Sequence, residues 1–191
     1  YSIAIVACCV ELVEAITPDL VAMFQEAGIF GVVQVGMAAD AAIVTHMDKA
    51  ALKYAEDRAA ELVTNITAST RDYMRTQVEH AVEQGSSPQE LADNIEESFG
   101  FSDSRSETIA RTELAMAHVE GNMEGWRESG EVEMKEVILG DNHDEEDECD
   151  DAVAMGAIPL EDSFGDLGDN PPFHPRCVCD ILPVLKSANE E

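Results

Sequence analysis

The chain has 191 residues, of which 45% are hydrophobic and 27% are charged, a composition typical of a folded protein rather than a disordered one. This length suffices for one ordinary domain, or for a compact domain with a small helical extension. Forty Asp and Glu residues against 11 Lys and Arg give a net charge of −29 and a pI near 4.1. A protein that reads nucleic acid through a basic face carries the opposite charge, so the composition argues against that class.

Two physical explanations of the acidity compete. One is a locally acidic protein that binds a basic partner or metal ions. The other is adaptation to molar salt, where the Debye length falls to about 3 Å and repulsion between like charges is screened. The acidic residues are spread along almost the whole chain, and only four Lys and seven Arg accompany them. We therefore favour adaptation to high salt.

The first 47 residues are predicted to form short apolar helices. The apolar run Ile3–Val10 falls well short of the roughly 20 residues that a membrane span needs, so it predicts a buried element rather than an anchor. Thr17-Pro18-Asp19 has the pattern of a helix start, and Gly28 is placed to end that helix. The stretch Gly31–Val44 fits a helix or a strand equally well. Because the chain begins with Tyr1 rather than Met, we expect a processed or partial piece of a longer protein.

From Asp48 onward, apolar residues recur at helical spacing and predict four helices joined by short turns. The third begins at Ser87-Pro88-Gln89-Glu90, which combines an N-cap, a first-turn proline and a capping-box glutamate. Short connections predict that consecutive helices are antiparallel. The predicted helices cover residues 48–66, 67–85, 87–100 and 102–130.

After Gly130 the hydrophobic period shortens to two, which predicts a strand over residues 132–139. Eight of the eleven residues in Asp141–Asp151 are Asp or Glu, and we expect a solvated loop or an ion site there. This block lacks the sixth-position glycine of an EF-hand loop, so a solvated loop is favoured over a calcium site. The stretch Ile158–Pro172 is predicted to be irregular, and a last strand closes the chain.

The strongest candidate for a metal site is the group of Cys149, His174, Cys177 and Cys179. Zinc takes four soft or borderline ligands in a tetrahedron, commonly from two close sequence elements, and the spacing of His174 and Cys177 is that of a compact metal knuckle. There is no intact Cys-x-x-Cys, and Glu146 or His143 could reach the same place. The alternative is that these cysteines are small buried hydrophobic residues, or that Cys149 forms a disulfide with Cys177 or Cys179.

Other polar and aromatic residues favour structural roles. Arg111 and Glu113 lie two apart in a predicted helix and do not face each other, so each needs a partner elsewhere, for example on a neighbouring helix. A buried ion pair that fixes helix register is favoured there over a polar functional pocket. Trp126 is expected in the core.

Sequence motifs of catalysis are missing, including the nucleophile elbow, the Walker loop and the dinucleotide-binding glycine pattern. Cys177 and His174 could form a nucleophile and its base. Three cysteines around one histidine favour ligation or structure instead, so we predict a protein that is not an enzyme.

Two motifs carry a family resemblance. Residues 105–113 read Arg-Ser-Glu-Thr-Ile-Ala-Arg-Thr-Glu, and residues 171–179 read Pro-Pro-Phe-His-Pro-Arg-Cys-Val-Cys. They resemble the Arg-x-x-x-Ile-Ala-Arg-Thr-Glu helix and the Pro-Pro-x-His-Pro-x-Cys-Arg-Cys ending of the phage-Mu-F-like head morphogenesis domain. Further similar segments lie in the same order as in that family: Tyr54–Val63, Gly85–Leu91, Gly121-Asn122, Trp126–Gly130 and Ile158–Leu160.

Two departures from the family pattern affect the cysteine cluster. Glu146-Asp147-Glu148-Cys149 stands where the family usually has Cys-x-x-Cys, and Val178 stands where it has Arg. If relatives bind a metal here, this chain uses Glu146 as an alternative ligand or has lost part of the site. Oxygen ligation of zinc is chemically acceptable.

The resemblance implies a structural role, because family members are minor head proteins of tailed phages and viruses, associated with the portal vertex. They act in procapsid assembly, DNA packaging or DNA ejection, and some are fused to portal or toxin domains. The implied partners are the portal protein and the major capsid or scaffold proteins, with at most indirect contact with packaged DNA and no membrane. The implied location is the head interior or portal vertex of the virion, and the host cytoplasm during assembly.

We therefore predict a mainly α-helical α+β fold, in which an antiparallel helical bundle precedes a small β element with a His/Cys cluster. Residues 1–47 are expected to form an N-terminal helical extension and residues 48–191 the head morphogenesis domain. Zinc, held by Cys149, His174, Cys177 and Cys179, is the one cofactor expected. The second hypothesis is a packaged or secreted toxin-type enzyme, or its carrier domain, that uses the His/Cys cluster.

Overall fold

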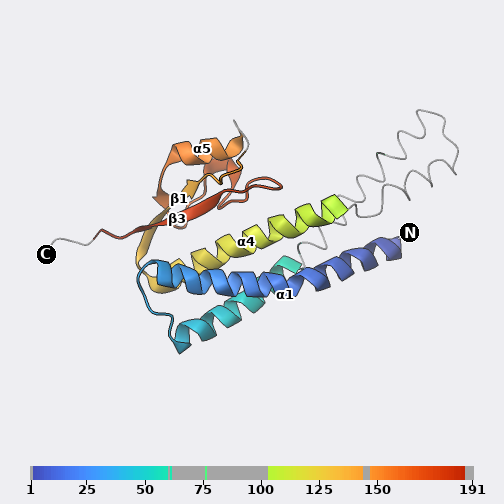
Figure 1. Ribbon diagram of the computed structural model, residues 1–191, viewed down its shortest axis with the longest axis horizontal. Helices are drawn as coiled ribbons and strands as arrows, with labels where there is room; N and C mark the ends of the chain where they lie inside the picture. The colour runs from blue at the N-terminus through green and yellow to red at the C-terminus, as the bar shows by residue number, and fades with distance from the viewer. Residues whose placement is uncertain (1, 60, 62–75, 77–102, 144–146, 188–191) are drawn as a thin grey trace.

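The computed structural model describes residues 2–59, 61, 76, 103–143 and 147–187. A bundle of long helices carries a small antiparallel sheet at one end (Figure 1), so the predicted mainly α-helical α+β fold is confirmed. The predicted helix 87–100 lies outside the described residues, and so does the predicted helix 67–85 except for residue 76. The elements are α1 (Ser2–Gln34), a helix over residues 41–59, α4 (Asp103–Ser129), β1 (Val132–Ile138), α5 (Glu148–Met155), β2 (Ile158–Pro159), the 3-10 turn η1 (Gly165–Leu167) and β3 (Asp180–Leu185).

Helix α1 is much longer than the sequence predicts. The predicted helix start at Thr17 is wrong, because Pro18 lies inside α1 and the Thr17 hydroxyl donates to the carbonyl of Val13 at 2.6 Å. Gly28 does not end the helix either. A proline in a helix interior costs about 3 kcal/mol, but the buried stripe of α1 continues past it on both sides. Burial of this stripe therefore outweighs the local signal to stop; its members are Val13, Ile16, Leu20, Phe24, Ala27 and Val32.

The ambiguous stretch Gly31–Val44 holds the end of one helix and the start of the next. The chain turns after Gln34 through Gly36, whose φ of +85° favours glycine. Asp40 then caps helix 41–59, since its Oδ1 accepts hydrogen bonds from the N–H groups of Ala42 and Ile43 at 2.8 and 3.0 Å. This helix thus begins seven residues before the predicted start at Asp48.

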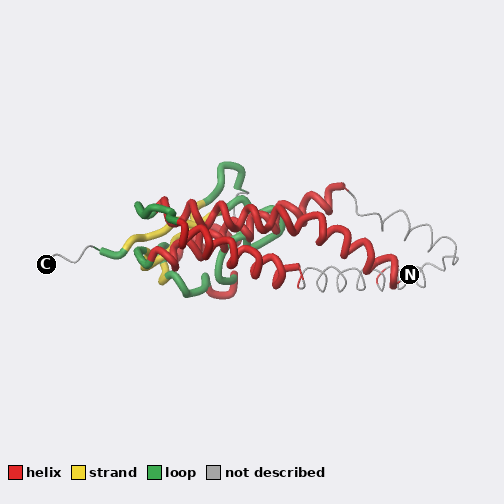
Figure 2. The backbone as a smooth tube through the Cα atoms, turned by 90° about the horizontal axis from the view of Figure 1, so that it is seen from below, coloured by secondary structure: helices red, strands yellow, loops and turns green. Residues whose placement is uncertain are grey.

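Helices α1 and α4 lie side by side and run in the same direction (Figures 1 and 2), with their backbones in contact. A Cβ added to Gly125 would overlap the carbonyl oxygen of Gly28, and one added to Gly121 would overlap that of Phe24. Only glycine permits so close an approach of two backbones. The four-residue spacing of Gly121 and Gly125 places both on the face of α4 that meets α1.

Helix 41–59 packs on both α1 and α4 and runs antiparallel to them (Figure 1). The rings of Tyr54 and Phe24 have centroids 4.9 Å apart, which ties this helix to α1. His46 Nε2 lies 2.7 Å from Glu124 Oε1, and Arg58 pairs with Glu113, so the helix is also held along α4. The antiparallel packing predicted for consecutive helices from Asp48 onward stays a prediction, because almost all of residues 62–102 lie outside the described residues.

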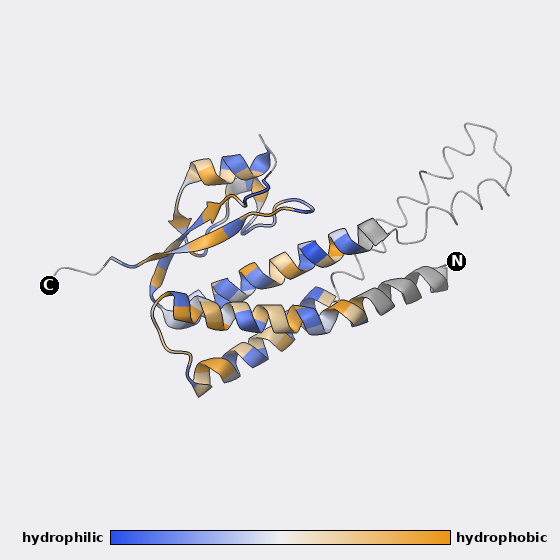
Figure 3. Cartoon of the chain, viewed as in Figure 1, coloured by the Kyte–Doolittle hydropathy of each residue, from blue (hydrophilic) through white to orange (hydrophobic). Residues whose placement is uncertain are grey.

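The sheet has the strand order β2-β1-β3, and both pairings are antiparallel. Its inner face packs on the second half of α4 around Trp126, which is fully buried as predicted. An irregularity between Val132 and Met134 breaks the simple alternation, so that Lys135 and Val137 face inward. Figure 3 shows long apolar (orange) stretches on α1 and more hydrophilic (blue) residues on α4.

The length and composition of residues Val13–Gln34 would allow this part of α1 to cross a membrane. The core helix of a soluble protein passes the same test, and this stretch buries Leu20, Phe24 and Val32 against its neighbours. The predicted absence of a membrane partner stays a prediction. The predicted domain boundary after residue 47 also stays a prediction, and this position lies inside the continuous helix 41–59.

We expect Gly125→Ala to destabilise the fold by about 2 kcal/mol, because the added methyl group forces α1 and α4 apart. Alanine is normally about 1 kcal/mol more favourable than glycine in a helix. A loss of stability in this variant would therefore be caused by the clash and not by helix propensity. The free energy of unfolding in urea measures the effect. Glu14→Ala, at an exposed position of α1, is the control and should change stability by less than about 0.5 kcal/mol. A stabilising Gly125→Ala substitution would contradict the close approach.

Candidate metal centre

The knuckle around His174 and Cys177 is a tight turn fixed to the bundle. The N–H of Cys177 donates to the carbonyl of His174 at 3.1 Å, and Arg176 between them has a φ of +66°. The Arg176 side chain donates from Nε to the Thr108 hydroxyl of α4 at 2.8 Å, and its backbone N–H lies 3.4 Å from the Thr112 hydroxyl. Helix α4 therefore positions the turn that presents the two predicted ligands.

Helix α5 brings Cys149 to the same place. The prediction that the whole of Asp141–Asp151 is a solvated loop is wrong, because α5 begins at Glu148. Asp147 is its N-cap and accepts the N–H of Cys149 at 2.8 Å, while the Asp150 carboxylate accepts the N–H of Asp147 at 3.2 Å. Acidic residues in a first turn interact favourably with the helix dipole. The acidic run is thus a helix start that holds Cys149 fully buried.

The structure places Cys149, His174, Cys177 and Cys179 close to one another, together with His143, which the sequence had named beside Glu146 as able to reach the cluster. Cys149 Sγ lies 3.3 Å from His174 Nε2 and 3.5 Å from Cys177 Sγ. Cys179 Sγ lies 3.7 Å from His143 Nδ1. Cys149 belongs to two groups whose donor atoms all lie within 4.8 Å of one another, one with His174 and Cys177 and one with His143 and Cys179. Glu146, the predicted alternative ligand, lies outside the described residues.

Burial affects the protonation of the thiols of Cys149 and Cys179. It raises the pKa of the Cys149 thiol, and the neighbouring thiols of Cys177 and Cys179 add to the effect. Burial also raises the pKa of Cys179. All three cysteines are free rather than disulfide-bonded. Thiolates need a cation beside them in such surroundings, and a bound metal ion displaces the thiol protons.

The spacing of the donor atoms fits a zinc ion. A tetrahedral ion with Zn–S bonds of about 2.3 Å and Zn–N bonds of about 2.0 Å has S···S edges near 3.8 Å and S···N edges near 3.5 Å. The separations of 3.3 and 3.5 Å in the group of Cys149, His174 and Cys177, and of 3.7 Å between Cys179 and His143 in the other group, are each of this size. His174 Nδ1 lies 3.1 Å from the Pro175 carbonyl, and donation there leaves Nε2 as the ligand atom. This group can therefore hold a metal ion.

Lys135 secures the loop that leads into the knuckle, and the sequence analysis missed this role. Its ammonium group donates to the carbonyl of Asp169 and to Asn170 Oδ1, both at 2.9 Å, and lies 5.6 Å from the centre of the Phe164 ring. Burial lowers the pKa of Lys135. The sequence held one indication of this role: Lys135 lies two residues before Val137 in the predicted strand, so the two side chains share one face of it.

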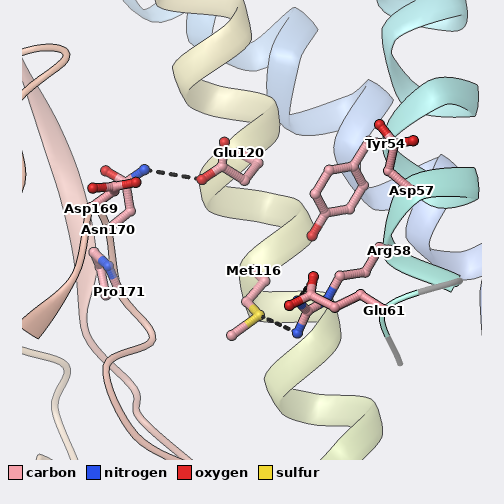
Figure 4. A pocket seen from close by; sticks show the side chains of 9 residues that line it. All are labelled: Tyr54, Asp57, Arg58, Glu61, Met116, Glu120, Asp169, Asn170 and Pro171. Atoms are coloured by element: carbon pink, nitrogen blue, oxygen red, sulfur yellow. Dashed lines mark hydrogen bonds and ion pairs between the residues drawn. The ribbon is translucent and has the colours of Figure 1, made fainter. Parts of the chain in front are cut away.

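A pocket of about 340 Å³ lies between helix 41–59, α4 and the loop at Asp169–Pro171 (Figure 4). Arg58 on its wall donates two hydrogen bonds to Glu113, at 2.5 and 2.8 Å, and a third to Glu61 at 2.7 Å. Glu113 raises the pKa of Arg58. The predicted buried ion pair of Glu113 with a neighbouring helix is therefore confirmed, whereas Arg111 is exposed and pairs with Glu107 of its own helix.

Comparison with known proteins connects this geometry to one family. The family model described as "Phage Mu protein F like protein" matches residues 72–182, more than half of the chain, including all of α4, β1, α5, β2 and the knuckle, and the start of β3. No match was found among curated proteins or among solved structures.

We expect Glu113→Ala to destabilise the fold by about 3 kcal/mol, because it leaves the largely buried Arg58 cation without its bidentate partner. Arg111→Ala is the matched control, since it removes an exposed pair on the same helix and should cost less than about 1 kcal/mol. Urea unfolding of both variants measures the difference. Equal losses of stability in the two variants would show that the buried Arg58–Glu113 pair stabilises the fold no more than the exposed pair does.

Proposed function

This chain belongs to the Phage Mu protein F-like family, and from that membership we propose that it is a minor head protein of a tailed virus, acting at the portal vertex or in the head interior. The family match over residues 72–182 is the observation that carries the proposal. The action that we propose is in procapsid assembly, DNA packaging or DNA ejection. Helix α4 contributes to two separate hydrophobic cores, one with the sheet and one with the other helices.

The net charge of −29 determines which partners are favourable. Phosphates of packaged DNA repel such a protein unless cations lie between them. We therefore propose that the portal protein, or the major capsid or scaffold protein, is the direct partner, and that contact with DNA is indirect.

We further propose that Cys149, His174, Cys177 and Cys179 bind a structural zinc ion. Structural sites are closed by protein ligands, whereas catalytic sites keep one place open for water or substrate. An ion here would join α5 to the knuckle and thereby to α4, because Cys149 comes from one element and Cys177 from the other. In a domain with one small sheet, such a link adds directly to the free energy of folding.

The enzyme hypothesis needs a reactive thiol beside a histidine. The sequence suggested Cys177 as the nucleophile with His174 as its base, whereas the thiol that lies 3.3 Å from His174 Nε2 is that of Cys149, the fully buried cysteine whose pKa is raised by burial. A raised pKa disfavours the thiolate that nucleophilic catalysis requires. The structure therefore supports the structural proposal better than the toxin-type enzyme.

Quantitative mass spectrometry of purified virus particles tests the head-protein proposal. We expect the chain in particles at a few to about a dozen copies per portal ring, the range that a symmetric vertex allows. Its absence from particles that contain portal would exclude a virion component.

Metal analysis of the purified chain tests the zinc proposal. We expect about one zinc ion per chain, lost in Cys149→Ser and Cys177→Ser, with a lower thermal unfolding midpoint after chelation because metal binding contributes folding free energy. Cys8→Ser is the control, as it changes a cysteine near the start of α1 and should retain the metal. A metal-free wild-type chain that unfolds at the same temperature with or without added zinc would contradict the proposal.

A further inference from the structure

His143 is held rigidly beside the cysteine cluster by the backbone around it. Its N–H donates to the carbonyl of Gly140 at 3.0 Å, and Gly140 itself packs against the backbone of Val178 so closely that a Cβ there would overlap the Val178 carbonyl. The loop after β1 is thus fixed against the segment that joins Cys177 to Cys179. The His143 side chain is only 10% exposed.

The two ring nitrogens of His143 meet different chemical groups. Nδ1 lies 3.7 Å from Cys179 Sγ and belongs to the group of donors that includes Cys149. Nε2 is buried and makes no hydrogen bond to any described residue, and it faces Asp150 Oδ1 at 3.4 Å and Asp147 Oδ1 at 3.6 Å. A proton on Nε2 directs the N–H to the carboxylates and leaves the Nδ1 lone pair facing the sulfur atoms.

Histidines that bind metals almost always present one nitrogen to the ion and donate the other N–H to a carboxylate or a carbonyl. We propose that His143 is a zinc ligand through Nδ1, so that Cys149, Cys177, Cys179 and His143 form a complete Cys₃His set. The inference rests on the zinc centre proposed above and changes its membership. Of the two residues that the sequence suggested for this place, Glu146 and His143, the inference selects His143.

Asp147 acquires a second role in this arrangement. One of its oxygens accepts the N–H of Cys149 and faces His143 Nε2, while the other lies 3.2 Å from His174 Nε2. The same carboxylate therefore caps the helix that carries one ligand and faces both histidine rings. His174 Nε2, 3.3 Å from Cys149 Sγ, remains an alternative nitrogen donor for an ion that takes four ligands.

Zinc competition with a chromophoric chelator tests the assignment on the full chain. We expect His143→Ala to weaken zinc binding by about 100-fold or more, exceeding the 10–100-fold that loss of a supporting second-shell group causes. His46→Ala is the matched control, because His46 also faces a carboxylate, Glu124, but lies on helix 41–59 in a pair away from the cysteines. It should bind zinc as the wild type does.

Nitrogen-15 NMR of the histidine rings in the zinc-loaded wild-type chain gives an answer that does not depend on how a variant folds. We expect His143 to show a metal-bound Nδ1 and a protonated Nε2. An unligated His143 ring together with unchanged zinc affinity in His143→Ala would overturn this inference and leave the zinc centre in place. A wild-type chain that binds no zinc would overturn both.

Discussion

The backbone contact between α1 and α4 is the constraint on which the rest of the structure depends. Gly28, Gly121 and Gly125 let the two helices meet without intervening side chains. At that separation helix 41–59 can pack on both at once, with Tyr54 on α1 and His46 and Arg58 on α4. A larger separation would leave Leu20, Phe24 and Ala117 without the dense contacts that protein interiors require.

Helix α4 joins the bundle to the candidate metal centre, and its Arg-Thr-Glu sequence shows how. Glu113 points to the bundle and pairs with Arg58, whereas the hydroxyls of Thr108 and Thr112 face Arg176 of the knuckle. Nearer the sheet, His118 lies 3.3 Å from Asp180, whose carboxylate raises the pKa of His118. Adjacent residues of one helix thus serve two packing partners, which explains the concentration of polar side chains there.

The acidic composition has a local structural use as well as a global one. The acidic residues of 147–151 lie at the N-terminus of α5, where they interact favourably with the helix dipole. Asp147 caps the helix and faces the two histidines of the cluster. These negative groups favour a bound cation and disfavour phosphate. The same charges disfavour direct contact with nucleic acid.

The sequence by itself determined the mainly α-helical class, the long helix α4, the strands β1 and β3, the buried Trp126 and the family, because these depend on local periodicity, caps and ordered motifs. It also placed Cys149 and the knuckle in one group, since compact spacing limits where Cys177 and Cys179 can lie. Only the tertiary structure decided that α1 continues through Pro18, because burial along its whole inner face outweighs a local break. It also decided the inward turn of Lys135, which arises from a strand irregularity, and the position of His143 beside Cys179, which the sequence could only suggest and which the close contact of Gly140 with Val178 fixes. Interactions between residues far apart in sequence produce these features, and no local pattern encodes them.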